Sequence, residues 1–259
     1  MSVEKMTRPP PSGRAALGRA TGATRPAIVA AVFIAKGALA EPFYVPSGSM
    51  EPTLLTRDAL LASKFPYGYG TSSLPIQINL PESGPCSRRR RTQGDVVVFR
   101  WPGDRSQAWV KRVVGLPGDR IQMRRASSSS MTGPPSSSPT AVAAEDDNGG
   151  SEPAYRYVET LPNGVSHLIF KMRDNGPLDN TPEVTVPAGH LFVLGDNRDN
   201  SADSRVPLRS GGVGLLPIDN LVGRADAVLG SWDLGMRGQP VWTCAATGFR
   251  LARFFTAVH

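Results

Sequence analysis

The 259-residue chain is long enough for one catalytic domain with a hydrophobic core, or for two small domains. Its 24 prolines and 27 glycines argue against a helical bundle and favour short strands separated by turns. Two cysteines, Cys86 and Cys244, are too few for a disulfide framework and have no metal-ligand spacing, so we expect no metal and no cofactor. The net charge of +7 is compatible with nucleic acid or anionic lipid as a partner.

The N-terminus combines a basic tail with an apolar run. Residues 1–25 are basic, rich in Pro, Gly and Ala, and without helical periodicity, which predicts a disordered tail. Residues 26–40 are apolar except for Lys36 and predict a marginal membrane anchor, because a spanning helix needs about 20 apolar residues. The basic tail would then stay in the cytoplasm. A buried core helix and an interfacial helix are the alternatives, and a cleaved secretory signal is less attractive.

Residues 41–54 carry two serines in a proline-rich stretch, Glu-Pro-Phe-Tyr-Val-Pro-Ser-Gly-Ser-Met-Glu-Pro-Thr-Leu. The three prolines forbid a regular helix, so Ser47 and Ser49 are expected on extended backbone with their side chains on the same face. Most serines in turns only make local hydrogen bonds, so this stretch alone is a weak catalytic signal. Residues 58–68 then predict an apolar strand closed by a Pro/Gly turn.

A loop and a hairpin are predicted next. Residues 69–93 are rich in Gly, Pro and Ser and end in four arginines, which predicts a solvated loop; contact of the arginines with anionic lipid is the alternative. Residues 94–101 are β-branched and aromatic and predict a strand. A Pro-Gly-Asp turn joins this strand to residues 107–114, so Lys111 is expected on a hairpin among apolar neighbours. A lysine there would ordinarily be an outward-facing strand residue.

The second half of the chain alternates strands with polar segments. Residues 126–152 are of low complexity and predict a disordered surface insertion. A Pro-Asn-Gly turn at 162–164 predicts a hairpin, and residues 184–194 predict a strand that runs into the dense polar segment 195–205. In the tail, residues 233–259, the apolar residues from Phe249 to Phe255 are spaced as in a short amphipathic helix. Such a helix could pack on the domain or contact the membrane interface, and the sequence is compatible with both roles.

Three segments in this order resemble the boxes of the bacterial type I signal peptidases, a family of serine–lysine proteases. Residues 46–54, Pro-Ser-Gly-Ser-Met-Glu-Pro-Thr-Leu, match the nucleophile segment, and residues 111–119, Lys-Arg-Val-Val-Gly-Leu-Pro-Gly-Asp, match the lysine box. Residues 195–205, Gly-Asp-Asn-Arg-Asp-Asn-Ser-Ala-Asp-Ser-Arg, match the last box. A further box resembles the stretch from Lys64 to Gly68. Together the boxes place a catalytic domain at residues 41–232.

The resemblance implies a role for each matched position. Ser49 would be the nucleophile and Lys111 its general base, which must be neutral to accept a proton and therefore needs burial to lower its pKa. The Ser49 N–H and the Ser47 hydroxyl would be the oxyanion donors, and Ser201 would orient the lysine by a hydrogen bond. The residues expected around the substrate are Phe43, Val45, Pro46, Met50, Leu54, Trp109, Val110 and Ala202. The residues expected to support the last box are Asp196, Asn197, Asp203 and Arg205, with an ion pair between the last two.

The implied activity is a membrane-bound endopeptidase that removes signal peptides from secretory preproteins after small residues at −1 and −3. The implied fold is mainly β, an antiparallel β-sheet catalytic domain with a marginal N-terminal membrane helix. The expected location is the bacterial inner membrane, with the catalytic domain on its outer face. The expected partners are preproteins and membrane lipids, and not nucleic acid.

Three alternatives compete with this interpretation. A self-cleaving repressor-type protease also uses a Ser–Lys pair, but it needs a DNA-binding helix-turn-helix where this chain has an apolar run. A basic module that binds nucleic acid or lipid would explain the net charge. The three boxes in the order of the family would then be a coincidence. A Ser-His-Asp triad would need His190, whose simpler interpretation is a partly exposed residue at a strand edge.

Overall fold

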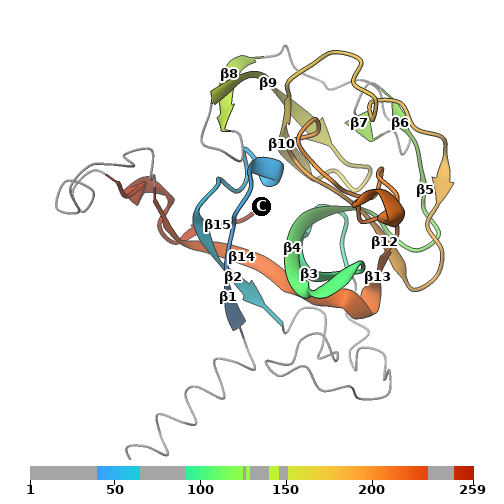
Figure 1. The fold of residues 1–259 in the computed structure, drawn as a ribbon, viewed down its shortest axis with the longest axis horizontal. Helices are drawn as coiled ribbons and strands as arrows, with labels where there is room; N and C mark the ends of the chain where they lie inside the picture. Colours follow the sequence, from blue (N-terminus) through green and yellow to red (C-terminus); the bar gives the residue numbers. More distant parts are fainter. Residues whose placement is uncertain (1–39, 65–90, 125–126, 129–139, 146–150, 233–247) are drawn as a thin grey trace, which may run out of the picture. The chain divides into compact units, whose positions relative to one another are not determined.

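The described part of the chain is almost entirely β-structure (Figure 1). The computed structural model describes residues 40–64, 91–124, 127–128, 140–145, 151–232 and 248–259. The prediction of a mainly β, antiparallel fold is confirmed. Within these ranges the helices are single 3-10 turns, and none is long and apolar enough to cross a membrane.

Several sequence-based expectations lie outside the described residues. These are the basic tail, residues 26–39 of the expected anchor, most of the 69–93 loop and both cysteines. Ala40, which was assigned to the end of the anchor, instead begins the first strand, where it pairs with Ser63.

Eight strands form the main sheet, and every pairing in it is antiparallel. Their order across the sheet is β1 (Ala40–Tyr44), β2 (Asp58–Ser63), β14 (Leu221–Ser231), β3 (Val96–Trp101), β4 (Asp104–Gly115), β12 (His190–Leu194) and β13 (Leu216–Pro217), with β15 (Thr256–Ala257) also paired to β14. The predicted hairpin is confirmed, because β3 pairs with β4 and places Val97 opposite Lys111.

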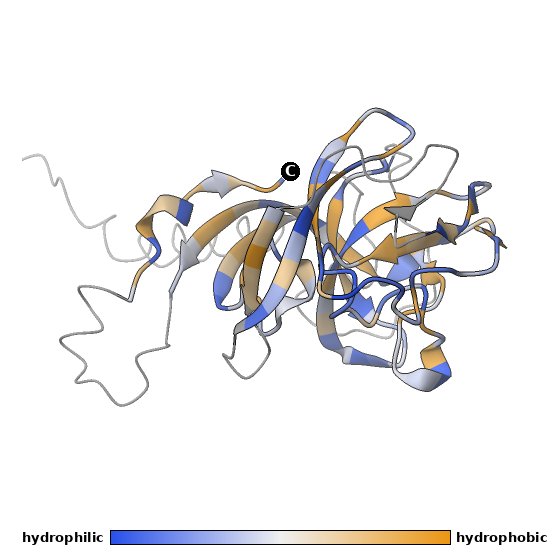
Figure 2. Cartoon of the chain, turned by 90° about the horizontal axis from the view of Figure 1, so that it is seen from above, coloured by the Kyte–Doolittle hydropathy of each residue, from blue (hydrophilic) through white to orange (hydrophobic). Residues whose placement is uncertain are grey.

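The core lies on both faces of β3. Successive side chains of a strand point to opposite faces. Val96 and Val98 therefore enter one apolar cluster, which also holds Met50 and Leu54 and is called cluster 1 here. Val97 and Phe99 enter a second cluster, with residues of β4, β12 and β13. Figure 2 shows the hydrophobic bands that this burial produces along the strands. β3 is thus a central strand between two packed layers, which gives the neighbouring β4 a rigid support.

A smaller sheet contains β8 (Thr140–Glu145), β9 (Ser151–Thr160) and β10 (Ser166–Lys171). The predicted hairpin at 162–164 is confirmed by the pairing of β9 with β10. The expectation that residues 126–152 are disordered is wrong for residues 127–128, 140–145 and 151–152. Residues 127–128 pair with residues 123–124, and β8 pairs with β9 along its whole length. The physical reason is burial: Ala144 and Ala154 pack against Phe170 in a separate apolar cluster.

Two short pairings complete the strands. β5 (Arg120–Ile121) pairs with β11 (Val184–Thr185), and β6 (Met123–Arg124) pairs with β7 (Ser127–Ser128). The turns η4 (Leu208–Ser210) and η5 (Ile218–Asn220) flank β13. These elements lie on the β12 side of the sheet (Figure 1).

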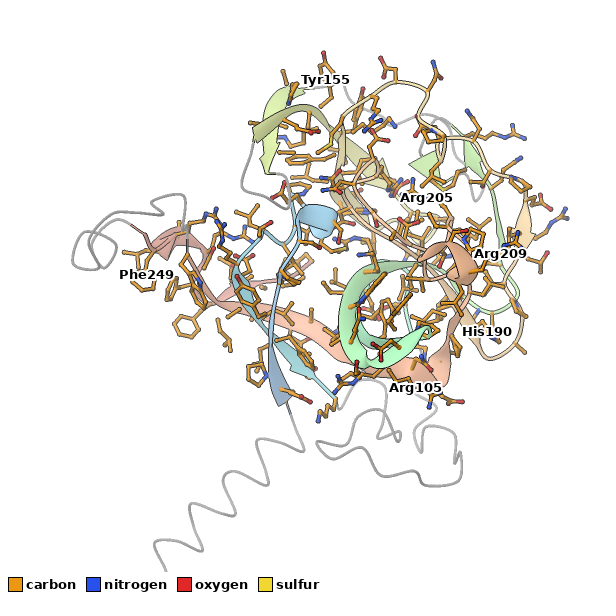
Figure 3. All side chains as sticks on the ribbon, in the orientation of Figure 1. Arg105, Tyr155, His190, Arg205, Arg209 and Phe249 are labelled. Carbon is orange, nitrogen blue, oxygen red and sulfur yellow. The ribbon has the colours of Figure 1, made fainter. Side chains whose placement is uncertain are left out.

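Residues 248–259 do not form the amphipathic helix that their spacing suggested. They form the single 3-10 turn η6 (Leu251–Arg253) and then β15. Hydrogen bonds to β14 stabilise this conformation, with Phe255 N donating to Val228 O at 2.7 Å and Val258 N donating to Asp226 O at 2.9 Å. Phe249 points outward from this end of the sheet (Figure 3). Strand pairing to β14 therefore takes the place of an isolated amphipathic turn.

Candidate active site

Ser49 lies in the 3-10 turn η1 (Gly48–Met50), directly after β1. Ser47 is extended as predicted, but the extended backbone predicted for Ser49 is wrong. The turn forms because Val45 still pairs with the start of β2, accepting from Arg57 N at 2.8 Å and donating to Asp58 O at 2.9 Å. The chain must therefore reverse within a few residues. Met50, which is fully buried in cluster 1, fixes the turn against the core.

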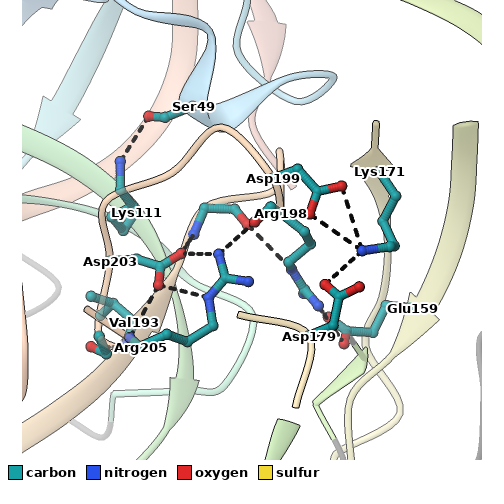
Figure 4. Close-up of polar contacts among 12 residues, drawn as sticks. Ser49, Lys111, Glu159, Lys171, Asp179, Val193, Arg198, Asp199, Asp203 and Arg205 are labelled. Atoms are coloured by element: carbon teal, nitrogen blue, oxygen red, sulfur yellow. Dashed lines mark hydrogen bonds and ion pairs between the residues drawn. The ribbon is translucent and has the colours of Figure 1, made fainter. Parts of the chain in front are cut away.

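Lys111 on β4 meets Ser49 inside the protein (Figure 4). Its Nζ donates to Ser49 Oγ at 2.7 Å and to the main-chain oxygen of Val110 at 3.0 Å. The Lys111 side chain is 4% exposed, and its Nζ lies 5.8 Å from the ring centroid of Trp109. Ser47 Oγ donates to Ser49 Oγ at 3.4 Å. A hydroxyl within hydrogen-bond reach of a buried amine has the geometry of a nucleophile with its base.

Ser201 does not make the hydrogen bond to Lys111 that the resemblance implied. Its Oγ is buried, and no hydrogen-bond partner for it lies among the described residues. Ser201 instead packs against Gly195: a Cβ added to this glycine would lie 2.2 Å from Ser201 Oγ and 2.5 Å from the main-chain oxygen of Ser49. That same Ser49 oxygen accepts from Asn197 N at 3.2 Å. The last box thus contacts Ser49 through backbone atoms.

Asp196 joins the segments that carry Ser49 and Lys111. Arg112, which follows Lys111, binds both carboxylate oxygens of Asp196. Its Nε donates to Oδ1 at 2.8 Å, and its Nη2 donates to Oδ2 at 2.7 Å. Thr53, which follows Ser49 in the chain, donates to Oδ2 at 2.5 Å. Burial alone would raise the pKa of Asp196, but the Arg112 charge and these hydrogen bonds lower it below its ordinary value. Asp196 is therefore an ionised link between the loop after Ser49 and the strand of Lys111.

The predicted ion pair between Asp203 and Arg205 is present and fully buried. Arg205 donates from Nε to Oδ1 at 2.9 Å and from Nη2 to Oδ2 at 2.8 Å, and Gly195 N donates to Oδ2 at 3.1 Å. Burial would raise the pKa of Asp203, but Arg205 and the backbone donors lower it. The pair holds the turn around Gly195 in place.

The sequence did not indicate the buried ion pairs that connect the last box, residues 195–205, to the smaller sheet (Figure 4). Arg198 binds Glu159 of β9, with Nη1 donating to Oε1 at 3.1 Å, and His167 of β10 lies 3.1 Å from the same carboxylate. Burial would raise the pKa of Glu159, but Arg198 and His167 lower it far below its ordinary value. Lys171 of β10 pairs with Asp179 at 2.7 Å and Asp199 at 3.3 Å. The smaller sheet therefore supports the last box through buried charges.

A cleft of about 490 Å³ opens beside Ser49 and Lys111. The predicted substrate residues that line it are Phe43, Val45, Pro46, Trp109, Val110 and Ala202, and Ser47 lines it as well. Met50 and Leu54 do not line it, because both are fully buried in cluster 1. The lining residues that the sequence did not indicate are Tyr44, Leu60, Val98, Gln107, Ala108 and Asn200.

No histidine takes part in this cleft. His190 begins β12 opposite Pro217, with Nδ1 3.2 Å from the main-chain oxygen of Ala188, and it does not line the cleft (Figure 3). Among the described residues, no group of three His, Cys, Asp or Glu side chains could hold a metal ion. In the part of the chain that the structure describes, the amine that is hydrogen-bonded to Ser49 Oγ is that of Lys111.

Comparison with known proteins relates this chain to peptidases. The family model described as signal peptidase, peptidase S26, matches residues 19–232. Signal peptidase I of Rickettsia typhi is 36% identical over 198 residues, which cover 73% of this chain and 71% of that protein. Signal peptidase I of Pseudomonas aeruginosa is 36% identical over 210 residues, which cover 78% and 68%. The crystal structure of a signal peptidase I from Enterococcus faecalis covers 53% of this chain and 98% of that chain, at 21% identity and a TM-score of 0.28.

The fold, the cleft and the family match together define the class of this protein as a peptidase. The chain belongs to the signal peptidase family, peptidase S26. The resemblance that rested on three ordered segments is thereby confirmed at the level of the family.

Proposed function

We propose that this chain is a membrane-bound endopeptidase that removes signal peptides from secretory preproteins, with Ser49 as nucleophile and Lys111 as general base. The observation that carries the proposal is the 2.7 Å contact between Lys111 Nζ and Ser49 Oγ beside an open cleft. The substrate class is supported by the family and by the names of its relatives, which are called signal peptidase I.

The reaction begins with proton transfer from Ser49 Oγ to the Lys111 amine. The mechanism requires the neutral Lys111 amine, because only this form can accept a proton. Lys111 is 4% exposed, and burial in general disfavours the charged form of a lysine. Ser49 Oγ then attacks the scissile carbonyl, the C–N bond breaks, and the protonated Lys111 gives its proton to the leaving amine, so that an acyl-enzyme ester remains. The neutral Lys111 next takes a proton from water, which attacks this ester. The proton passes to Ser49 Oγ as the acid product leaves.

The oxyanion needs donors that are already aimed at it. Ser47 Oγ lies 3.4 Å from Ser49 Oγ, and both residues line the cleft. With the Ser49 N–H it forms the pair of donors that the mechanism requires. Asn197 N donates to the main-chain oxygen of Ser49 at 3.2 Å, which holds the Ser49–Met50 peptide next to the site.

The substrate would bind as an extended strand between β1 and β4. Both elements contribute to the cleft, β1 through Phe43 and Tyr44 and β4 through the residues from Gln107 to Lys111. Backbone pairing gives affinity in this mode, and side-chain pockets give specificity. Val45, Leu60 and Val98 line the cleft with aliphatic groups, which fit small apolar side chains such as alanine. A membrane anchor within residues 26–39 would keep the cleft on the outer face, where signal peptides are cleaved.

The purified full chain, in detergent, is expected to cleave a preprotein whose signal sequence ends in Ala-x-Ala. Mass spectrometry of the products should place the cut directly after the second alanine. A matched preprotein with Leu in place of the alanine at −1 should be cleaved much more slowly, because the cleft admits small side chains. Cleavage of both substrates at equal rates, or of neither, would overturn the proposal.

Gly195→Ala is expected to lower the rate of preprotein cleavage by about 10²-fold, because displacing reacting groups by 1 Å can cost that much. The added Cβ would collide with Ser201 and with the main-chain oxygen of Ser49. Gly189→Ala is the control, because Gly189 lies directly before β12 and Gly195 directly after it. The φ of 78° at Gly189 also makes the substitution strained, but the added Cβ would meet open space. Equal rates for the two variants, measured under the same conditions, would contradict this role of Gly195.

A further inference from the structure

Residues 248–259, called the β15 segment here, contact the main sheet next to the site. β15 pairs with β14, and Arg250 N donates to Ser231 O at 2.9 Å at the start of the segment. Val258 packs against cluster 1, which contains Met50 and Leu54 from the nucleophile region. The segment is thus held by backbone pairing along one side and by apolar contact at its end.

Arg253 of this segment holds the loop that follows the nucleophile. Residues 51–57, called the nucleophile loop here, connect η1 to β2. Arg253 Nη2 donates to the main-chain oxygen of Thr53 at 3.0 Å and also pairs with the carboxylate of Asp58. Asp58 is fully buried, and its Oδ2 accepts from Leu55 N at 2.9 Å. A buried carboxylate requires such a partner, and charge-assisted bonds are the stronger class of hydrogen bond.

A second arginine of the segment adds to this contact. Arg250 Nη1 donates to the main-chain oxygen of Thr56 at 3.0 Å. Carbonyl groups in an irregular loop lack the partners that a strand or helix supplies, so they need donors from elsewhere. The β15 segment provides two of them, at Thr53 and Thr56, within the same loop.

The β15 segment also reaches the lysine side of the site. Arg112, which follows Lys111, donates from Nη2 to the main-chain oxygen of His259 at 2.9 Å and to Thr53 Oγ1 at 3.1 Å. The segment therefore contacts the nucleophile loop, at Thr53 and Thr56, and also Arg112, the residue directly after Lys111. Neither Arg253 nor Arg250 lines the cleft.

We infer that Arg253 is a positioning residue: it fixes the nucleophile loop so that Ser49 Oγ stays within hydrogen-bond reach of Lys111 Nζ. The inference rests on the proposed function for its kinetic consequence. Because Arg253 lies outside the cleft, its loss should lower kcat and leave KM nearly unchanged. Small displacements of reacting groups are enough for a large effect on rate.

The kinetic test compares Arg253→Met with wild type in preprotein cleavage by the full chain. We expect kcat to fall between about 10-fold and 100-fold, with KM unchanged. Arg253→Lys should recover part of the rate, since an ammonium group can still pair with Asp58. Arg120→Met is the matched control, because it removes an arginine–carboxylate pair with Glu183 that is exposed and lies on β5. A raised KM with unchanged kcat, or a kcat equal to that of Arg120→Met, would overturn the inference.

A structural test needs no substrate and stands even if no preprotein is cleaved. Amide hydrogen exchange of peptides that cover residues 51–58 should be faster in Arg253→Met than in wild type and in Arg120→Met, while peptides from β3 and β4 stay unchanged. Unchanged exchange in residues 51–58 would refute the inference and leave the proposed function intact. If Arg253→Met does not fold, Arg253→Lys replaces it in the kinetic test and in the exchange test. Its kcat should then be below that of wild type, and its exchange in residues 51–58 should be faster than in wild type.

Discussion

Ser49→Ala is expected to abolish preprotein cleavage, with a loss in rate on the order of 10⁶-fold, as for the nucleophile of other serine proteases. The reason is that the substitution removes the attacking oxygen itself. The variant should still fold, because η1 is held by Met50 in cluster 1 and by the backbone bonds of Val45. Lys111 also keeps its bond to the main-chain oxygen of Val110.

Ser210→Ala is the matched control for this experiment. Ser210 also lies in a 3-10 turn, η4, but it is exposed and does not line the cleft. Its loss should leave both the cleavage rate and the melting temperature unchanged. Retained activity in Ser49→Ala, measured with the same preprotein and enzyme concentration, would show that another residue is the nucleophile.

Lys111→Arg is expected to be as inactive as Lys111→Met, although it keeps the positive charge and much of the length of the side chain. An arginine cannot be deprotonated in proteins, so it cannot accept the proton of Ser49. This substitution separates a base from a merely electrostatic group, because a group that acts only by its charge would tolerate arginine.

The comparison needs the rates of all three forms under single-turnover conditions and their melting temperatures. Equal melting temperatures for Lys111→Arg and Lys111→Met would show that the loss of rate is chemical. Substantial cleavage by Lys111→Arg would mean that Lys111 is not the base of Ser49.

Strand pairing in the core could be predicted from the sequence because its signals are local. The run from Val96 to Trp101 is β-branched and aromatic, and the Pro-Gly-Asp turn after it allows only a short connection, so the β3–β4 hairpin and the position of Lys111 follow. The strand β8 was missed because the composition around it is of low complexity. Its burial depends on Phe170, which belongs to another strand.

The resemblance implied that Ser49 and Lys111 lie together, but the structure around them was not predicted. The turn at Ser49 depends on the long-range pairing of Val45 with Asp58 and on the burial of Met50, which no local pattern reveals. Met50 and Leu54 were expected at the substrate site because they lie close to Ser49 in the sequence. In the folded chain the turn directs them into cluster 1 and away from the cleft.

Contacts between distant parts of the chain could not be predicted from the sequence. Glu159 pairs with Arg198 across 39 residues, and Arg253 pairs with Asp58 across 195 residues. Charged residues are mostly exposed, so a polar segment such as 195–205 predicts a hydrated loop by default. Burial of Asp196, Arg198 and Asp203 with opposite charges reverses that expectation.

The dependence of the cleavage rate on pH tests the Ser49–Lys111 mechanism most directly. Single-turnover cleavage of one preprotein by the wild type should be measured between about pH 5 and pH 10. Protonated Lys111 cannot accept the Ser49 proton, so the rate should fall on acidification, with an apparent pKa well below the ordinary lysine value of about 10.4. A rate that stays constant down to the acid end of this range, in an enzyme that remains folded there, would contradict a neutral lysine as the base.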